Sequence, residues 1–373
     1  MAMRIVQLVP AMEQGGVERG VVEMNRALVR AGCENTVVSA GGRLVDRIVA
    51  DGGRHVELDV KSKNPLTYLP RALALRRVLR EIAPDVVVAH SRVPAWLFVW
   101  ANRTLGLKWI TFAHGANSVS RYSRIMTAGD LTVTPSRYIA DYLKDAYAIQ
   151  EERLRVIPRA IERDKFDTSA LDKDFIAAKR AEWGVEGHRV VMGLGRITQL
   201  KGYDTLIKAT AVVRRSVPEV KTVIVGEAEA LRKDVEASLY ALVRELGLED
   251  AVVFAGNQQK VAECLSIADV VVSANTRKPE AFGRSMAEAL AMNRPVVATA
   301  FGGAQDIEED GVNGFLVPPA RADAEGFADA LLRALAKDFG DVRTPALEKF
   351  SFERMVSRAL AVYGEFGALR EAR

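Results

Sequence analysis

Short runs of β-branched residues alternate with amphipathic helical patterns along this chain, and after a charged, irregular stretch the rhythm starts again. Such alternation is typical of βαβ units, whose parallel strands form a sheet covered by helices on both faces. A chain of 373 residues is also too long for a single core. We therefore predict an α/β protein of two domains, each with a parallel sheet. The expected strands are 4–9, 36–40, 55–60, 85–90, 109–113, 131–134 and 154–157, then 190–195, 222–226, 252–255, 270–274, 296–299 and 315–317.

The boundary between the two domains is expected in the charged segment that follows Pro158. We place the first domain at residues 1–165 and the second at residues 166–352. The last amphipathic stretch, 353–373, follows a break at Pro345. It is expected to form a helix that packs back on the first domain.

The net charge of +4 is unevenly divided between the halves. Residues 1–165 hold 25 Lys and Arg against 17 Asp and Glu, whereas residues 166–373 hold 27 against 31. A basic first half favours an anionic partner, such as a membrane surface or a phosphorylated acceptor. Nucleic acid is disfavoured, because aromatic side chains are not interleaved with the basic ones and no known binding module is present.

The longest apolar run, 93–101, is much shorter than the roughly 20 residues that span a bilayer. The amino-terminal residues lack the apolar core and cleavage site of a signal peptide. We expect a cytoplasmic protein, with at most peripheral attachment to the inner face of the cytoplasmic membrane. Cys33 and Cys264 lie in different predicted domains, so reduced thiols are expected.

The pair Gly15-Gly16 joins the first expected strand to a helical pattern. Backbone N–H groups at a helix start behind glycines allow an anion to approach closely, so Gly16 is a candidate for binding a phosphorylated ligand. A tight turn between strand and helix explains the pair equally well. The loop is not the Gly-x-Gly-x-x-Gly fingerprint, and the next strand ends in Ser39-Ala40-Gly41 without an acidic residue for a nicotinamide ribose. A dehydrogenase is therefore disfavoured.

The second domain opens with a strand that runs into Gly195-Arg196 and then Lys201-Gly202. Two cations between glycines on a strand-to-helix loop favour the binding of a diphosphate, with Arg196 as a planar multiple donor and Lys201 as a point charge. The alternative is a pair of solvated loop charges.

Two glutamates lie in the segment 279–288, which follows a predicted strand. Glu280 precedes a helix, has no capping role and favours a function. Glu288 lies inside the helix, and because Ser285-x-x-Glu288 also matches a capping box, capping and binding remain equal alternatives for it. The backbone N–H groups expected to face a phosphate at the helix start are those of Phe282, Gly283, Arg284 and Ser285.

Together these motifs resemble glycosyltransferase family 4, whose members have the GT-B fold of two Rossmann-like domains with parallel sheets facing a deep interdomain cleft. The resemblance covers nearly the whole chain. Within the family, the chain resembles bacterial lipopolysaccharide-core glycosyltransferases. The motifs that carry it are Gly-Gly-Val-Glu at 15–18, Thr-Pro-Ser at 134–136, Gly-Arg at 195–196 with Lys-Gly at 201–202, the segment from Glu280 to Glu288, Gly-Gly at 302–303 and Asp-Gly-Val-Asn-Gly at 310–314.

The resemblance implies a retaining transferase that moves a hexose from a UDP- or GDP-linked sugar to a saccharide or glycolipid acceptor, in lipopolysaccharide core or other cell-envelope glycan synthesis. It implies that Arg196 and Lys201 bind the donor diphosphate, that Glu280 contacts the transferred sugar and that Glu288 contacts the ribose. Many members have Asn-Gly after the linker proline, whereas this chain has Pro158-Arg159-Ala160. That departure puts the local backbone geometry in doubt, since alanine tolerates positive φ poorly.

No cofactor and no metal are expected, because Arg196, Lys201 and the helix starts offset the charge that develops on the leaving phosphate. The one Asp-x-Asp sequence, at 172–174, is expected to be solvated surface. His114 ends a predicted strand at the edge where ligands bind in open α/β sheets, and the resemblance implies that it orients the donor sugar. The alternative is a histidine satisfied by local backbone. His90 also ends a strand, but no motif supports a role for it.

Two other functions remain as alternatives: a GT-B transferase acting on a soluble small-molecule acceptor, and a non-catalytic protein that binds a nucleotide sugar. For the basic half, a helical pattern after Lys61 and Lys63 is the candidate membrane contact, with an ordinary solvated helix face as the equal alternative. Its arginines recur among leucines, at Arg71, Arg76, Arg77 and Arg80.

Overall fold

The computed structural model describes residues 2–13, 15–228 and 233–371, and within them the side chains up to residue 366. The chain divides into two compact units. Unit 1 consists of residues 1–159 and 352–373, and unit 2 consists of residues 160–351. Each unit has its own sheet, so the predicted α/β class with two parallel sheets is confirmed.

The sheet of unit 1 has seven strands in the order β3-β2-β1-β4-β5-β6-β7, and every neighbouring pair is parallel. The order reverses between β1 and β4, so this is the point where ligands usually bind in an open parallel sheet. The strands are β1 (Arg4–Leu8), β2 (Glu34–Ser39), β3 (Arg54–Glu57), β4 (Val86–Ala89), β5 (Trp109–Phe112), β6 (Leu131–Thr134) and β7 (Leu154–Val156).

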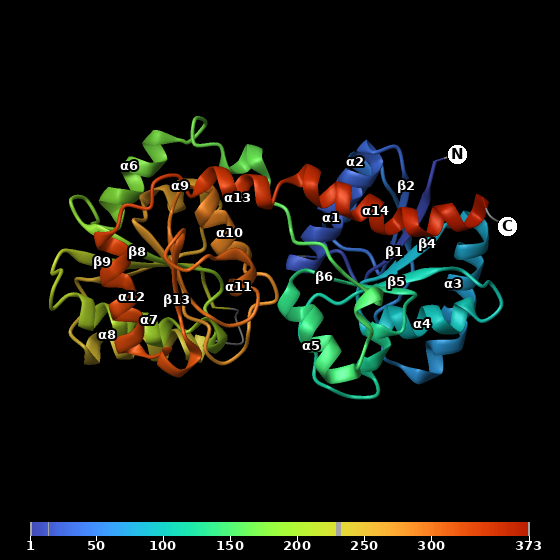
Figure 1. Ribbon diagram of the computed structural model, residues 1–373, viewed down its shortest axis with the longest axis horizontal. Helices are drawn as coiled ribbons and strands as arrows, with labels where there is room; N and C mark the ends of the chain where they lie inside the picture. Colours follow the sequence, from blue (N-terminus) through green and yellow to red (C-terminus); the bar gives the residue numbers. More distant parts are fainter. Residues whose placement is uncertain (1, 14, 229–232, 372–373) are drawn as a thin grey trace. The chain divides into compact units, whose positions relative to one another are not determined.

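Helices cover both faces of this sheet (Figure 1). Helices α1 and α2 contact each other on one face, where α1 also contacts α14, and α3 contacts α4 on the other. The helices of unit 1 are α1 (Gly16–Arg30), α2 (Val45–Ala50), α3 (Tyr68–Ile82), α4 (Arg92–Asn102), α5 (Arg137–Tyr147) and α14 (Phe352–Glu371), with short 3-10 turns η1 (Pro65–Thr67), η2 (Ser123–Thr127) and η3 (Glu151–Arg153).

The sheet of unit 2 has six parallel strands in the order β10-β9-β8-β11-β12-β13. It reverses between β8 and β11 in the same way as the first sheet. The strands are β8 (Arg189–Leu194), β9 (Val220–Val225), β10 (Val252–Gly256), β11 (Val270–Ser273), β12 (Val296–Thr299) and β13 (Gly314–Val317).

In Figure 1 the helices α6, α9, α10 and α13 lie on one side of this sheet, and α7, α8 and α12 lie on the other. Two hydrophobic clusters fill the two faces accordingly. The helices are α6 (Lys173–Glu182), α7 (Tyr203–Val213), α8 (Lys233–Glu245), α9 (Val261–Ile267), α10 (Arg284–Ala291), α11 (Ala304–Ile307), α12 (Ala324–Ala336) and α13 (Arg343–Lys349), with 3-10 turns η4 (Arg163–Phe166), η5 (Gln199–Lys201) and η7 (Pro319–Arg321).

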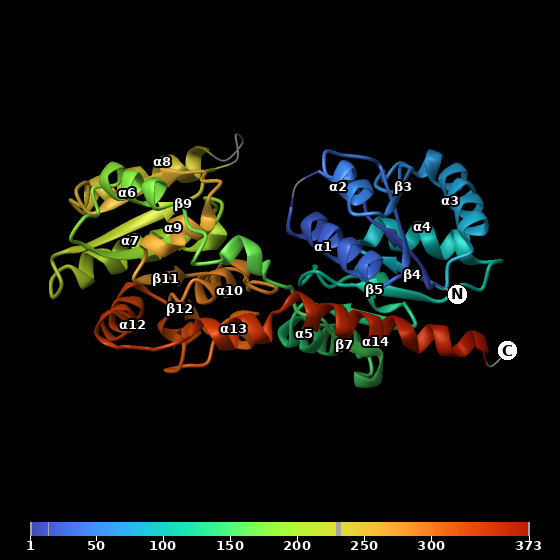
Figure 2. The same cartoon turned by 90° about the horizontal axis from the view of Figure 1, so that it is seen from above.

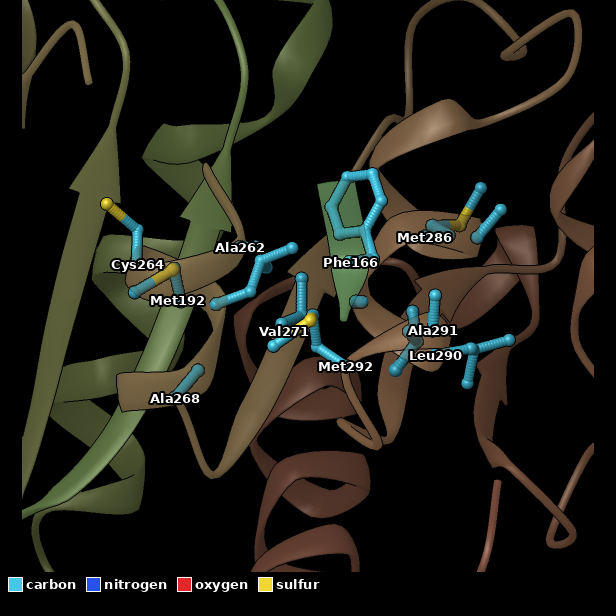
Figure 3. Close-up of a cluster of buried hydrophobic side chains, with 14 of the residues drawn as sticks. Phe166, Met192, Ala262, Cys264, Ala268, Val271, Met286, Leu290, Ala291 and Met292 are labelled. Carbon is cyan, nitrogen blue, oxygen red and sulfur yellow. The ribbon is translucent and has the colours of Figure 1, made fainter. Parts of the chain in front are cut away.

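The inner face of α10 is anchored in one of these clusters. Figure 3 shows Met286 and Leu290 of this helix among the buried side chains that surround Phe166. Both α10 residues are fully buried, and an apolar side chain of this size contributes about 1.5–3 kcal/mol when it leaves water. The start of α10 is therefore held firmly against the sheet.

The first unit ends at Arg159, whereas the sequence suggested a boundary after residue 165. The reason lies in packing, because Ile161 and Phe166 are buried in the core of unit 2. Helix α14 belongs to unit 1, and its buried residues include Met355, Ala359 and Tyr363. Figure 2 shows α14 running beside β7, to which Glu365 is tied by two hydrogen bonds of 3.0 Å from Arg155.

None of the helices in the described part of the chain is both long enough and apolar enough to be a transmembrane segment.

Candidate active site

Lys201 and Glu280 meet in unit 2, although they are far apart in the sequence. Lys201 ends the turn η5 after β8, and Glu280 lies in the loop between β11 and α10. The Lys201 ammonium donates to the Glu280 carboxylate, and the Asn275 side-chain amide donates to the same oxygen at 2.9 Å. The Lys201 and Glu280 side chains are 25% and 24% exposed, so a ligand could still reach them. The sequence singled out both charged residues separately, and the structure brings them together.

The charge state of Glu280 follows from these contacts. Burial alone would raise the pKa of the Glu280 carboxyl, but the charge and hydrogen bond of Lys201, the Asn275 amide and the charge of Arg196 together lower it. Arg196 is exposed in the loop that follows β8. The site therefore holds one ionised carboxylate that is stabilised by the charges of two cations.

Glycines allow the loops of this site to approach each other. Gly202 has φ 65°, and a Cβ there would stand 1.9 Å from the carbonyl oxygen of Ala274. Gly302 has φ 76°, and a Cβ there would stand 2.5 Å from the carbonyl oxygen of Glu280. The same carbonyl accepts a hydrogen bond of 2.8 Å from the Gly303 N–H. The backbone on either side of the Lys201–Glu280 pair is thus fixed by close packing.

Helix α10 starts two residues earlier than the capping-box alternative requires. Gly283, with φ 97°, precedes the helix, and no side chain caps it. Ser285 is the second helical residue, so the capping-box alternative for Glu288 does not hold. Arg284, Ser285 and Glu288 are half-buried, and Glu288 has a partner within the protein. Phe282 is different, because its side chain is buried edge-on against Phe350, with ring centroids 5.4 Å apart. Only the backbone of Phe282 is therefore left to face a ligand.

Asn275 is a residue that the sequence did not single out. It is buried directly beyond the end of β11, and its Oδ1 has no hydrogen-bond partner among the described residues. An unpaired buried acceptor is costly, so such an atom is a natural partner for a ligand hydroxyl. The signal that could have identified Asn275 is its position as a polar residue at the carboxyl end of a strand. The same signal identified His114 as a candidate.

In unit 1, Gly16 is the first residue of α1, and no atom lies within 4 Å of where its Cβ would stand. His114 follows β5, and both of its ring nitrogens are engaged within the unit. Its Nε2 lies 2.8 Å from Nδ1 of His90, and its Nδ1 lies 2.7 Å from Nη2 of Arg159. A sugar hydroxyl would have to displace one of these partners. His90, for which no motif supported a role, is a direct partner of His114.

The Asp-x-Asp sequence has a structural explanation. Asp172 caps α6 by accepting from the Phe175 N–H at 2.9 Å, and it pairs with Lys260 at 2.5 Å. Within residues 2–13, 15–228 and 233–371, no three His, Cys, Asp or Glu side chains gather as a metal-binding group.

The basic helix predicted after Lys63 is α3, but its arginines differ in role. Arg71 is buried and donates to the carbonyl groups of Asp59, Asn64 and Thr67. Arg76 donates to the last carbonyl groups of α4, at 3.0 and 3.1 Å. Only Arg77 and Arg80 of the four are exposed, so two of the predicted membrane contacts serve the fold instead.

The fold and the charged site define a glycosyltransferase of the GT-B class. The family model described as Glycosyltransferase Family 4 matches residues 14–165, and that described as Glycosyl transferases group 1 matches residues 175–348. The chain belongs to glycosyltransferase family 4, and it is a transferase.

Three similar proteins illustrate the range of the family. LpsE, a lipopolysaccharide core biosynthesis glycosyltransferase of Rhizobium meliloti (strain 1021), is 29% identical over 90% of each chain. A D-inositol 3-phosphate glycosyltransferase of Xylanimonas cellulosilytica is 30% identical over 97% of this chain and 94% of its own. The solved structure of HepE of Anabaena in complex with UDP and glucose has a TM-score of 0.80 and 21% identity, over 97% of this chain and 99% of that one.

Proposed function

We propose that this protein is a retaining, metal-independent hexosyltransferase that uses a UDP- or GDP-linked sugar as donor and a saccharide of the cell envelope as acceptor, as in lipopolysaccharide core synthesis. The observation that carries the proposal is the cluster of Lys201, Glu280 and Asn275 in unit 2. Lys201 and Arg196 supply positive charge for a diphosphate, and Glu280 and Asn275 supply acceptors for sugar hydroxyls. The diphosphate and the sugar are the two groups on either side of the bond that the transfer breaks.

The chemistry follows from this division. As the bond between sugar and diphosphate breaks, negative charge grows on the leaving phosphate. Lys201, Arg196 and the amides at the start of α10 stabilise that charge, which is usually the largest contribution to catalysis. Fixed cations at the phosphate can do what a divalent metal does in other transferases. In a retaining reaction the acceptor attacks from the side that the diphosphate leaves.

Nucleotide release from a panel of UDP-, GDP- and ADP-sugars tests the proposed donor. Hydrolysis or transfer with one base above the others is the expected result, and it should persist after dialysis against EDTA. Activity that is lost with EDTA and restored by Mg²⁺ or Mn²⁺ would overturn metal independence. A protein that binds nucleotides but releases none, with glycolipid and soluble acceptors both supplied, would be the non-catalytic alternative.

The acceptor is proposed to be a saccharide on a lipid because LpsE is named for the lipopolysaccharide core and unit 1 contains the basic part of the chain. D-inositol 3-phosphate, named for the second relative, represents the soluble alternative. Transfer from the preferred donor to a truncated lipopolysaccharide core and to D-inositol 3-phosphate distinguishes the two. Transfer to the soluble acceptor alone would overturn the envelope assignment.

We also propose that unit 1 docks on an anionic bilayer through an α3 surface, formed by exposed residues of η1, α3 and the preceding loop. Leu66, Leu69 and Leu73 are 87%, 55% and 42% exposed, an unusual set for a surface. Exposed cations surround them, and each contributes about 1 kcal/mol near an anionic leaflet. The α3 surface consists of Lys61, Lys63, Leu66, Leu69, Leu73, Arg77 and Arg80.

Sedimentation with phosphatidylglycerol vesicles and with phosphatidylcholine vesicles tests this surface. Binding to the anionic vesicles only, weakened by salt and by Arg77→Ser with Arg80→Ser, is expected. Leu66→Ser with Leu69→Ser should weaken it as well, because those side chains would enter the interface. Lys208→Ser with Arg215→Ser changes two exposed cations of unit 2 and serves as the control. Equal recovery in the supernatant with both vesicle types contradicts the proposal.

A further inference from the structure

A line of polar side chains runs through unit 1 from the last residue of its first segment into the sheet. Arg159 Nη2 lies 2.7 Å from His114 Nδ1, His114 Nε2 lies 2.8 Å from His90 Nδ1, and His90 Nε2 lies 2.9 Å from Gln7 Oε1. Gln7 is a residue of β1, and the two histidines follow β4 and β5. This line of polar side chains therefore lies where the strand order of the first sheet reverses.

The line continues from Gln7 through β2 to helix α1. Gln7 donates to Asn35 Oδ1 at 3.1 Å, Asn35 donates to Asn25 Oδ1 at 2.7 Å, and Asn25 donates to the carbonyl oxygen of Ile48 at 3.1 Å. Gln7, Asn35 and Asn25 are buried, so water does not substitute for these partners.

The two ends of the line fix the direction of every bond in it. A carbonyl oxygen only accepts, and a guanidinium only donates. Starting from the Ile48 carbonyl, each side-chain amide donates to the neighbour nearer Ile48 and accepts from the neighbour on its other side. Gln7 therefore presents its Oε1 to His90. His90 must then carry its proton on Nε2 and accept at Nδ1, and His114 must do the same. Each imidazole can hold only one proton, because a second would place two donors in one bond.

The electrostatics agree with this assignment. Burial and the charge of Arg159 lower the pKa of His90 to about 3. Burial, then Arg159, then His90 lower the pKa of His114 well below its ordinary value. The other close neighbour is the Phe112 ring, which stacks on His114 with ring centroids 4.2 Å apart and carries no charge.

Arg159 is held on two further sides. Its guanidinium carbon stands 5.4 Å from the centroid of the Phe112 ring. A Cβ at Gly20 of α1 would stand only 1.6 Å from its Nη1, so the helix has a glycine where the guanidinium packs. Arg159 is half-buried, and the guanidinium is thus oriented from several sides while part of the residue stays exposed.

We propose that Gln7, His90 and His114 are positioning residues that hold Arg159 in one orientation, and that Arg159 binds a phosphate group of a substrate in the transfer reaction proposed above. This inference rests on the proposed function and changes the role expected for His114, which acts through Arg159 and not on the donor sugar. The phosphate belongs either to the donor or to a phosphorylated acceptor, and both have the chemistry that a guanidinium recognises.

Nitrogen NMR of histidine-labelled wild-type protein tests the direction of these hydrogen bonds. The protein has four histidines, and His90→Gln and His114→Gln assign the two of interest. Both rings are expected to be neutral, with the proton on Nε2, from pH 5 to pH 9. A proton on Nδ1, or titration of either ring in that range, overturns the proposal.

Gln7→Glu is the sharpest variant, since a carboxylate of the same shape cannot donate to Asn35 and stabilises a second proton on His90. We expect the pKa of His90 to rise into the measurable range, and sugar-nucleotide turnover to fall as His90 protonates. Gln7→Met removes both bonds at similar volume and should lower turnover by ~10- to 100-fold at all pH values. His55→Gln is the control, because His55 is not part of this line of hydrogen-bonded side chains. Wild-type turnover with an unchanged pH profile in both Gln7 variants contradicts the positioning role.

Binding measurements separate this inference from the proposed function. If the phosphate is that of the donor, Arg159→Met weakens UDP binding at least tenfold. If it is that of the acceptor, UDP binding is unchanged, and inorganic phosphate binds to UDP-loaded wild type but not to UDP-loaded Arg159→Met. If Arg159→Met changes neither UDP binding nor phosphate binding, while the protein still binds UDP and turns over a sugar nucleotide, the role of Arg159 is refuted. The transferase assignment is then unaffected.

Discussion

Glu280 is ionised because of its neighbours and not because of its exposure, so its charge can be removed with little change of shape. Glu280→Gln should lower transfer by at least ~100-fold, since a fixed charge at the reacting sugar is lost. The affinity for UDP should change little, because the diphosphate is assigned to Lys201 and Arg196. Turnover and calorimetric UDP binding measure the two effects. Loss of UDP binding together with normal turnover would reverse the assignment.

Lys201 and Arg196 are expected to show the opposite pattern. Lys201→Met and Arg196→Met each remove a charge-assisted hydrogen bond worth about 1.5–3 kcal/mol, so each should weaken UDP binding by roughly 10- to 150-fold. Lys208→Met, at an exposed position of α7, is the matched control for lost charge. The assignment fails if the control and the two site variants bind UDP alike.

Glu308 is a buried carboxyl with no hydrogen-bond partner on either oxygen among the described residues. Burial, helped by Asp310, raises the pKa of Glu308 well above its ordinary value. The unfolded chain loses this proton near pH 4.3 while the folded chain keeps it, so the contribution of Glu308 to stability falls as pH rises from that value toward the folded pKa.

Glu308→Gln cannot ionise, so it should be more stable than the wild type at pH 7, by about 1.4 kcal/mol for each unit between the folded and unfolded pKa values. The advantage should vanish near pH 4. Chemical unfolding of both proteins at pH 4 and pH 7 measures it. A difference that is the same at both pH values would mean that Glu308 is not protonated in the folded protein.

Some residues of the candidate site could be identified from the sequence, and others could not. The pattern identified Lys201 and Glu280, because charged residues next to glycines at strand ends are recognisable without coordinates. It did not identify Asn275 or the partnership of His90 with His114, since those depend on which strand ends are neighbours in the sheet. It assigned Arg71 and Arg76 to a surface, because an arginine that donates to carbonyl groups looks in sequence like one that meets solvent.

The loops between strands and helices contain glycines of two kinds, which a pair of variants can separate. Gly202 and Gly247 have nearly the same positive φ, 65° and 62°, but a Cβ at Gly202 meets the Ala274 carbonyl and one at Gly247 meets nothing within 4 Å. Gly247→Ala should cost about 1 kcal/mol of unfolding free energy, from backbone strain alone.

Gly202→Ala should cost clearly more, because the backbone around Ala274 must also move. UDP binding should fall with it, since Lys201 precedes Gly202 and Asn275 follows Ala274. Chemical unfolding and calorimetry measure both quantities. Equal losses for the two alanine variants would show that the close approach at Gly202 is not rigid.

Most strands were predictable as elements because they are buried runs rich in β-branched residues, and a sheet covered on both faces requires such runs. All thirteen expected strands occur. The start of α10 was less predictable, because Gly283 alone ends the preceding loop and no capping side chain marks the position. The interpretation of Ser285 as a cap was reasonable from sequence spacing, but the backbone conformation of Gly283 decided the start.

At the scale of the whole molecule, α14 is the one helix of unit 1 that lies far from the others in sequence. Tyr363 is fully buried in unit 1, so Tyr363→Ala should lower the stability of that unit by about 3–5 kcal/mol. Ser357→Ala, on the exposed side of the same helix, is the control. Hydrogen exchange should show the loss in β1 and α1 while the strands of unit 2 stay protected. Equal loss in both units would argue against two separate cores.

The position of α14 also sets an order for synthesis. A growing chain leaves the ribosome with residues 1–159 first, yet the helix that completes their unit comes only after all of 160–351 has emerged. The second unit to be translated is therefore the first that can finish folding, while the earlier one waits with the α14 side of α1 uncovered. Translation arrested just after Ser351 should leave a protease-resistant unit 2 attached to a cleavable unit 1, so a chaperone would be needed most at the beginning of the chain and not at its end.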